Sequence, residues 1–117
     1  MKEISLQSIE ELNEIMALSF SEEIDGVFIF KHSTRCSISS MVWNRLQRDW
    51  NFDDSKVKFY YLDLLRHRDV SNKIAELTGV EHQSPQLIGI KNGKAFYDAS
   101  HTMIRVLDAE NALKKGH

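Results

Sequence analysis

The sequence predicts an α/β domain in which a central mixed sheet is flanked by helices, with elements in the order βαβαβα followed by ββα. Three observations support this prediction. Segments with the two-residue period of strands alternate with segments of helical period. The continuous apolar run at residues 27–30 suits a parallel strand that is buried on both faces. Residues 92 and 93 are Asn-Gly, a strong hairpin signal, and predict an antiparallel edge to the sheet.

The N-terminal quarter of the chain predicts a strand, a helix and a second strand. Apolar and polar residues alternate at 4–6, which indicates a short strand. Ser8 and Glu11 have the spacing of a capping box, and apolar residues follow at helical spacing, so we expect the first helix at residues 8–20. An Asp-Gly pair then breaks the chain before a buried strand at residues 27–31.

The middle of the chain predicts two more helices around a third strand. A helix begins near Cys36, and its apolar residues recur every fourth position; they are Ile38, Val42, Leu46 and Trp50. Alternation at residues 57–62 predicts the strand. Apolar residues at helical spacing between 70 and 77 mark the next helix, which Gly79 ends.

The C-terminal third predicts the hairpin and a last helix. The hairpin strands lie at residues 87–90 and 95–97, on either side of the Asn-Gly turn, whose type I′ form needs positive φ at both central residues. Ser100 or Thr102 can cap the last helix. The apolar residues expected on that helix are Ile104, Val106, Leu107 and Leu113.

Composition excludes several classes of protein. The chain has 117 residues, with 15 Lys and Arg against 17 Asp and Glu, and it shows no repeat or linker, so we treat residues 1–117 as a single domain. One cysteine cannot form an internal disulfide, a C-x-x-C zinc ribbon or a dithiol pair. The sequence contains no stripe of basic residues that could bind nucleic acid, and no apolar run is long enough to span a membrane. We therefore expect a cytoplasmic protein that binds neither nucleic acid nor membranes.

Cys36 is the residue best placed for chemistry, because it lies between a buried strand and the first turn of a helix. The unpaired amides of that turn, from Ser37, Ile38 and Ser39, and the helix dipole favour an anion. Nearby residues add positive charge; they are Arg35, Lys31 and, when protonated, His32. We therefore expect a stabilised thiolate. The alternative is a small, unreactive core residue, because free Cys is among the most buried residue types.

Two more residues bear on the reaction. Ser39 occupies the place where a second cysteine would complete C-x-x-C, so an external thiol would have to resolve any mixed disulfide at Cys36. Pro85 begins a predicted strand, where an isolated proline most often only ends the hydrogen-bond ladder. A cis Ser84–Pro85 bond would instead expose the backbone of residue 84 to an extended substrate. The residues alone leave both interpretations open.

The order and spacing of these features resemble the thioredoxin fold over essentially the full chain. A more specific set of residues resembles the bacillithiol-system monothiol bacilliredoxin family, also known as a general-stress thioredoxin-like family. These residues are Lys31-His32-Ser33-Thr34, Cys36 with Ile38-Ser39, Ser84-Pro85-Gln86, Lys91-Asn92-Gly93 and Ser100-His101. The combination is far more specific than Cys-x-x-Ser alone.

The resemblance implies a monothiol thiol–disulfide oxidoreductase that reduces mixed disulfides between client proteins and bacillithiol. Cys36 would attack the bacillithiol sulfur and release the client thiol, and a second bacillithiol, the low-molecular-weight co-substrate, would free Cys36. No tightly bound cofactor and no metal is implied, and Pro85 would be cis and face Cys36. The family usually has Thr before the cysteine and Pro after it, where this chain has Arg35 and Ser37. Redox potential and client choice depend on that difference.

Glutaredoxin-like relatives imply a place for the polar tail of the small thiol at the start of the last helix. Ser100, His101 and Thr102 occupy that place. Because a helix N-terminus binds anions and bacillithiol carries a malate group, we expect these residues to bind its carboxylates. The alternative is that Ser100 or Thr102 is only a cap and His101 a surface residue. The expected substrate-binding residues are thus Arg35, Ser84, Pro85, Ser100 and His101.

Other functions stay open on the residues alone. Cys36 with histidines could bind a metal, although the paired spacing of structural zinc is missing; the candidates are His32, His67, His82 and His101. Iron–sulfur binding by a monothiol glutaredoxin would need Gly-Phe where this chain has Ser37-Ile38. A redox-responsive binding protein, modified at Cys36 by bacillithiol without multiple turnover, is excluded by no sequence feature.

Overall fold

The computed structural model describes residues 1–115, whose alternating strands and helices follow the predicted order up to the hairpin. The elements are β1 (Glu3–Ser5), α1 (Ile9–Leu18), β2 (Gly26–His32), α2 (Ser37–Asp49), β3 (Val57–Asp63), α3 (Arg68–Thr78), β4 (Gln86–Lys91), β5 (Lys94–Ser100), a 3-10 turn η1 (His101–Met103) and α4 (Val106–Lys114).

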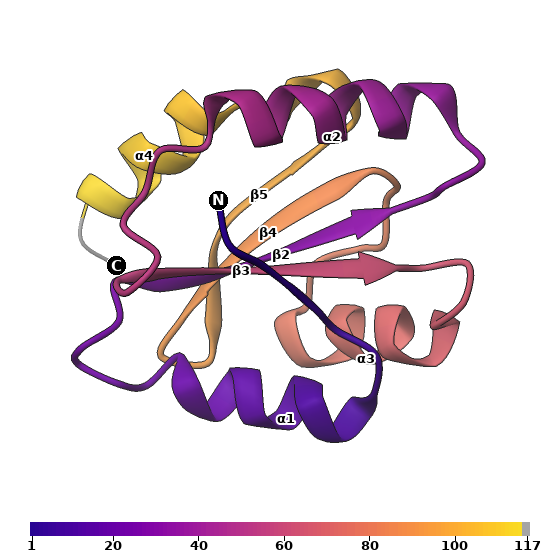
Figure 1. Ribbon diagram of the computed structural model, residues 1–117. Coiled ribbons are helices and arrows are strands. Elements are labelled where there is room, and N and C mark those ends of the chain that lie inside the picture. The colour runs from indigo at the N-terminus through magenta and orange to yellow at the C-terminus, as the bar shows by residue number, and fades with distance from the viewer. Residues whose placement is uncertain (116–117) are drawn as a thin grey trace.

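The strands form a mixed sheet in the order β1-β3-β2-β4-β5, as the sequence predicts for the hairpin edge. β2 lies at the centre, parallel to β3 and antiparallel to β4, and β5 completes the antiparallel edge. Helices α1 and α3 cover one face of the sheet, and α2 and α4 cover the other (Figure 1). The molecule therefore has three layers, with the sheet in the middle.

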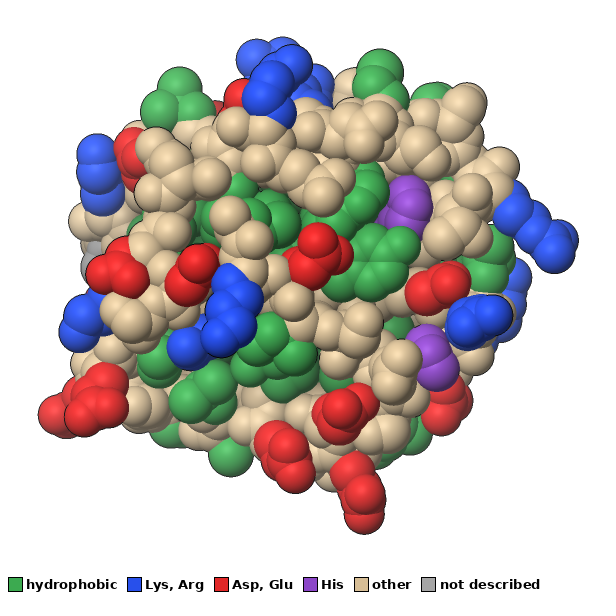
Figure 2. Space-filling view, in the orientation of Figure 1, with side chains coloured by type: hydrophobic (Ala, Val, Ile, Leu, Met, Phe, Trp, Pro, Cys, Tyr) green, Lys and Arg blue, Asp and Glu red, His purple; other side chains and the backbone are tan. Residues whose placement is uncertain are grey.

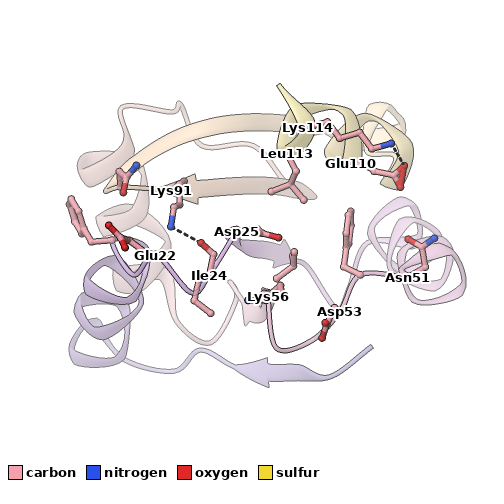
Figure 3. Close-up of a pocket in the computed structure, with 14 residues that line it drawn as sticks. Glu22, Ile24, Asp25, Asn51, Asp53, Lys56, Lys91, Glu110, Leu113 and Lys114 are labelled. Carbon is pink, nitrogen blue, oxygen red and sulfur yellow. Dashed lines mark hydrogen bonds and ion pairs between the residues drawn. The ribbon is translucent and has the colours of Figure 1, made fainter. Parts of the chain in front are cut away.

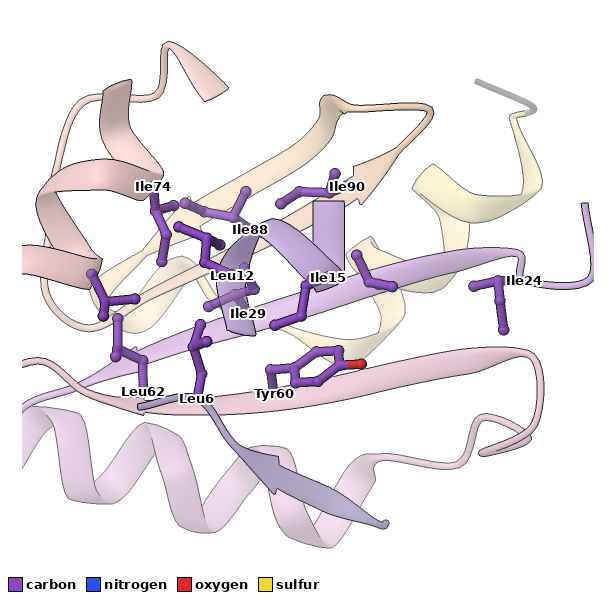
Figure 4. Close-up of a cluster of buried hydrophobic side chains, with 12 residues drawn as sticks. Leu6, Leu12, Ile15, Ile24, Ile29, Tyr60, Leu62, Ile74, Ile88 and Ile90 are labelled. Carbon is purple, nitrogen blue, oxygen red and sulfur yellow. The ribbon is translucent and has the colours of Figure 1, made fainter. Parts of the chain in front are cut away.

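Two cores form because successive residues of β2 point to opposite faces of the sheet. Val27 and Ile29 face α1 and α3, in a cluster of mostly aliphatic side chains (Figure 4). Phe28 and Phe30 face α2 and α4, in a cluster rich in aromatic rings. All four side chains are fully buried, which explains why this strand is an unbroken apolar run.

The predicted cap of α1 and the predicted hairpin turn are confirmed. The side chain of Ser8 accepts a hydrogen bond from the Glu11 N–H at 3.1 Å, so it caps α1 as predicted. Asn92 and Gly93 have φ of 54° and 74°, the left-handed values that a type I′ turn needs. The Asn92 N–H donates to the Ser19 carbonyl at 2.8 Å, which ties the hairpin to the end of α1.

The prediction for the last helix is wrong at its start. Ser100 precedes only the short turn η1, Thr102 lies within that turn, and α4 begins at Val106 with Arg105 at its N-cap. Ile104 separates the two elements in an extended conformation and is fully buried. Arg45 of α2 donates hydrogen bonds to the carbonyls of Thr102 and Ile104, so tertiary contacts hold this segment out of the helix.

The surface carries charges of both signs. Figure 2 shows acidic side chains gathered along the α1 edge, and Lys and Arg side chains spread around the rest of this face. Within residues 1–115, no helix combines the length and the apolar character that crossing a bilayer would require.

Candidate functional site around Cys36

Cys36 is the N-cap of α2, in the loop that follows the central strand. Its N–H donates to the Ser33 carbonyl at 3.1 Å, and its carbonyl accepts the N–H of Ser40 at 3.1 Å. The N–H groups of the first helical turn have no carbonyl partner within the helix, so they point toward the N-terminal end where the thiol lies. Cys36 is half-buried rather than part of the core, which removes the alternative of an inaccessible thiol.

Ser39 lies one helical turn below Cys36 and is fully buried. Its Oγ accepts the N–H of Ser33 at 3.0 Å and lies 2.6 Å from Nδ1 of His32. In the described part of the chain, no hydrogen bond joins this hydroxyl to the thiol of Cys36. The role expected for Ser39 toward the thiolate therefore stays a prediction, whereas its contact with His32 is a feature that the sequence analysis missed.

His32 is enclosed beneath the start of α2. Its ring lies 5.7 Å from that of Phe30 and 5.5 Å from that of Tyr61, measured between centroids. Burial lowers the pKa of His32, and the Asp63 carboxylate opposes that shift. The sequence contains a signal for the contact between His32 and Ser39. His32 follows the buried Phe30 by two residues, so it lies on the same face of β2. Ser39 precedes the buried Val42 by three residues, so it lies on the face of α2 that packs against β2.

The prediction that Lys31 adds positive charge beside Cys36 is wrong. Lys31 points to the opposite face of the sheet from α2, where its Nζ donates to the Ser71 carbonyl at 3.3 Å and lies 3.2 Å from Nδ1 of His82. The side chain is fully buried, and burial lowers the pKa of Lys31 to about 8. Of the three predicted cations, only Arg35 lies exposed in the loop before Cys36. Lys31 lies near Cys36 in sequence, but neighbouring residues of a strand point to opposite faces of the sheet.

The Ser84–Pro85 peptide bond is cis, which settles the alternative that the residues left open. β4 follows directly, and its Gln86 pairs with Lys31 near the end of β2. The proline therefore lies at the edge of the sheet formed by the strand ends, where β2 leads into the Cys36 loop. Pro85 is buried, whereas Ser84 is half-buried with its Oγ in no hydrogen bond to any residue of the described chain.

Ser100 and His101 reach the same edge, although not as a helix start. Ser100 pairs with Gln86 across β4 and β5, and the His101 N–H donates to the Pro85 carbonyl at 2.9 Å. His101 has a φ of 55°, a left-handed conformation that is uncommon for a residue other than Gly. The predicted helix N-terminus at these residues does not exist, so any binding by them rests on side chains and loop amides.

A cleft lies at the other end of the molecule. It encloses about 880 Å³ and includes Asp25 before β2, Val57 at the start of β3 and Lys91 at the end of β4 (Figure 3). Since β2 runs from that end toward Cys36, the cleft and the thiol lie at opposite ends of the strands. Among residues 1–115, no cluster of three or more His, Cys, Asp or Glu side chains is arranged to hold a metal ion.

Comparisons with known proteins agree with this geometry. The family model for the monothiol bacilliredoxin BrxC matches residues 4–108. A solved structure described as a candidate oxidoreductase with a thioredoxin fold is 31% identical, with a TM-score of 0.74 over 94% of this chain and 92% of that one. Thioredoxin from Trypanosoma brucei brucei, at 17% identity, has a TM-score of 0.73 over 97% and 89% of the two chains. Thioredoxin from Malassezia sympodialis, at 15% identity, has 0.71 over 98% and 90%.

The fold predicted from the order of elements is therefore confirmed as the thioredoxin fold. The single thiol of the chain lies at the N-cap of α2 in that fold. The chain is a thiol oxidoreductase and belongs to the monothiol bacilliredoxin family.

Proposed function

We propose that this protein reduces mixed disulfides between client proteins and bacillithiol, with Cys36 as the nucleophile. The observation that carries the proposal is one half-buried thiol at a helix N-cap, with Ser39 where a resolving cysteine would stand. A protein with this arrangement cannot complete a dithiol cycle by itself. Membership of the monothiol bacilliredoxin family supports bacillithiol as the thiol that completes it.

The reaction consists of two thiol–disulfide exchanges. The Cys36 thiolate attacks the bacillithiol sulfur of the mixed disulfide, a new S–S bond forms, and the client leaves as a thiolate that takes up a proton. A second bacillithiol thiolate then attacks the bacillithiol sulfur bound to Cys36. This step forms bacillithiol disulfide and returns the Cys36 thiolate, so the net reaction converts the mixed disulfide and one bacillithiol thiol into a client thiol and bacillithiol disulfide.

The surroundings of Cys36 suit both exchanges. The first-turn amides of Ser37 and Ile38 support a negative charge on the sulfur. The cis bond lies at the same sheet edge and leaves the Ser84 backbone available to an extended substrate. We assign the polar part of bacillithiol to the exposed and partly exposed donors around this edge. They are Arg35, Ser100 and His101, the last two lying beside Pro85.

Intact-mass analysis of the purified protein tests the proposal. We expect exposure to bacillithiol disulfide to give a single adduct on Cys36, and added bacillithiol to remove it completely. Glutathione disulfide at the same concentration serves as the control and is expected to react more slowly, because it lacks the malate group. Failure to form the adduct, or an adduct that bacillithiol leaves in place, would contradict the proposal.

An apolar surface next to the thiol supports proteins as the clients. It consists of Ile38 and Met41 on α2 and Met103 on η1, with exposed fractions of 45%, 50% and 68%. Arg45 holds η1 against α2, so the three side chains belong to one part of the surface. Flexible methionine side chains adapt to varied partners. We assign this surface to contact with client polypeptides.

Replacing Met103 tests that assignment. We expect Met103→Ser to lower kcat/KM for a bacillithiolated client protein about threefold to tenfold, since lost apolar contact is worth on the order of 1 kcal/mol. The rate with bacillithiol disulfide should stay within about twofold. Leu107→Ser, at a similarly exposed position on α4, is the matched control and should change neither rate. Equal losses on both substrates would show that Met103 serves the reacting sulfur rather than the client.

A further inference from the structure

We propose that His32 is a positioning residue whose protonation turns the Ser39 hydroxyl toward Cys36, so that imidazolium formation and thiolate formation favour one another. The inference rests on Cys36 being the reacting thiol, as proposed above. It does not depend on which low-molecular-weight thiol is used. The two hydrogen bonds at Ser39 carry the argument.

The Ser39 hydroxyl can accept two hydrogen bonds and donate one. The Ser33 N–H fills one acceptor site at 3.0 Å. When His32 is neutral with its proton on Nε2, Nδ1 can only accept, and the 2.6 Å contact uses the single proton of Ser39. The hydroxyl then has nothing left to donate to Cys36. This is consistent with the lack of a Ser39–Cys36 hydrogen bond among the described residues.

A protonated His32 reverses that bond. Nδ1–H then donates to Ser39, both acceptor sites of the hydroxyl are filled, and its proton is free. Cys36 is the N-cap of α2 and Ser39 is its third residue, which is the spacing at which the two side chains of a capping box lie near one another. A thiolate at Cys36 is therefore the acceptor that this geometry offers. The hydroxyl and the positive ring would both stabilise the charge on sulfur.

Charged groups around His32 permit such a state. β3 contributes Asp63, which pairs with His32 in the strand register and has a buried Oδ1 without a hydrogen-bond partner in the described chain. Tyr61, also on β3, has its pKa raised by burial, so it stays neutral at physiological pH. α2 contributes Cys36, and Lys31 faces away. An imidazolium thus gains from Asp63 and from a thiolate.

The coupling acts on the step that releases Cys36. In the mixed disulfide the Cys36 sulfur carries no charge, and burial lowers the pKa of His32, which keeps the ring neutral. When bacillithiol displaces Cys36, the emerging thiolate favours proton uptake by His32 and the donation from Ser39. By linkage, the charge on sulfur and the proton on His32 change each other's affinity by the same factor. Cys36 becomes a better leaving group as a result.

NMR titration of the His32 ring tests the coupling without any bacillithiol. We expect the midpoint in the reduced protein to lie at least half a pH unit above that in protein capped at Cys36 with methyl methanethiosulfonate, a threefold or greater change in proton affinity. Ser39→Ala should remove most of the difference. Ser40→Ala, on the next residue of α2, should preserve it.

Each outcome decides one question. Equal His32 midpoints in the reduced and capped wild-type proteins would overturn the inference, even if Ser39→Ala fails to fold. A full difference in a folded Ser39→Ala protein would mean that charge alone couples the groups, and would remove the role of the hydroxyl. If the coupling is present but bacillithiol gives no turnover, the proposed function fails and the inference stands.

Discussion

We expect Cys36→Ser to abolish turnover of bacillithiolated clients and to leave only the background exchange between client and free bacillithiol. The reason is chemical, because a serine hydroxyl cannot take up a sulfur by disulfide exchange and the chain has no other thiol. The measurement is release of client thiol under excess bacillithiol, followed over many turnovers. The fold should be retained, since the side chain is half-buried and makes no hydrogen bond to other described residues.

Ser40→Ala is the matched control for this experiment. Ser40 lies on the same helix and donates its backbone N–H to the Cys36 carbonyl, a hydrogen bond that the substitution leaves in place. Its rate should stay within about twofold of wild type. Residual multiple turnover by Cys36→Ser would contradict the assignment of the nucleophile. A wild-type protein that reacts once and then stops would instead indicate a redox-responsive binding protein modified at Cys36.

The fold could be predicted from the sequence because its signals are local. Period-two and helical patterns, the Ser8 cap and the Asn92-Gly93 turn each specify their own element, and the order of elements specifies a mixed sheet. The predicted start of the last helix was wrong because a contact between residues distant in sequence determines it. Ser100 and Thr102 are adequate caps by residue type, but Arg45 binds the carbonyls of that segment from another helix.

Some residues of the candidate site could likewise be predicted from the sequence, and others could not. Cys36 and Pro85 could be found because a single cysteine at a helix start and a single proline at a strand start are visible in the sequence. The His32–Ser39 hydrogen bond depends on how α2 packs on β2, which the residue pattern suggests only after the faces are assigned. Lys31 was placed wrongly because a run that is buried on both faces does not reveal which side a polar residue takes.

Lys31→Met is expected to raise the free energy of unfolding by about 1 to 3 kcal/mol at pH 7. The Lys31 side chain is fully buried, and among residues 1–115 its Nζ has only neutral hydrogen-bond partners, the Ser71 carbonyl and the His82 ring. Burial lowers its pKa to about 8, so the folded protein holds a charge at pH 7 that the unfolded chain solvates better. Met has a similar length and needs no hydrogen bond.

The dependence on pH distinguishes this explanation from a simple gain in packing. Between about pH 8 and the unfolded pKa of about 10.4, the unfolded chain binds a proton at Lys31 that the native protein has lost, so wild-type stability rises with pH. The advantage of Lys31→Met should therefore shrink to about 1 kcal/mol or less by pH 9.5. Urea unfolding of both proteins at pH 7 and pH 9.5 measures it.

Lys114→Met separates the effect of burial from that of removing any lysine. Lys114 is an exposed residue of α4 that pairs with Glu110 at 3.5 Å, and exposed pairs contribute little to stability. Its substitution should leave the free energy of unfolding within about 0.5 kcal/mol at both pH values. If Lys31→Met lowers stability at pH 7, or gives the same gain at both pH values, then the buried ammonium is not the source of the instability. A loss of stability at pH 7 would mean that the contacts of Nζ with Ser71 and His82 stabilise the fold more than desolvation opposes it.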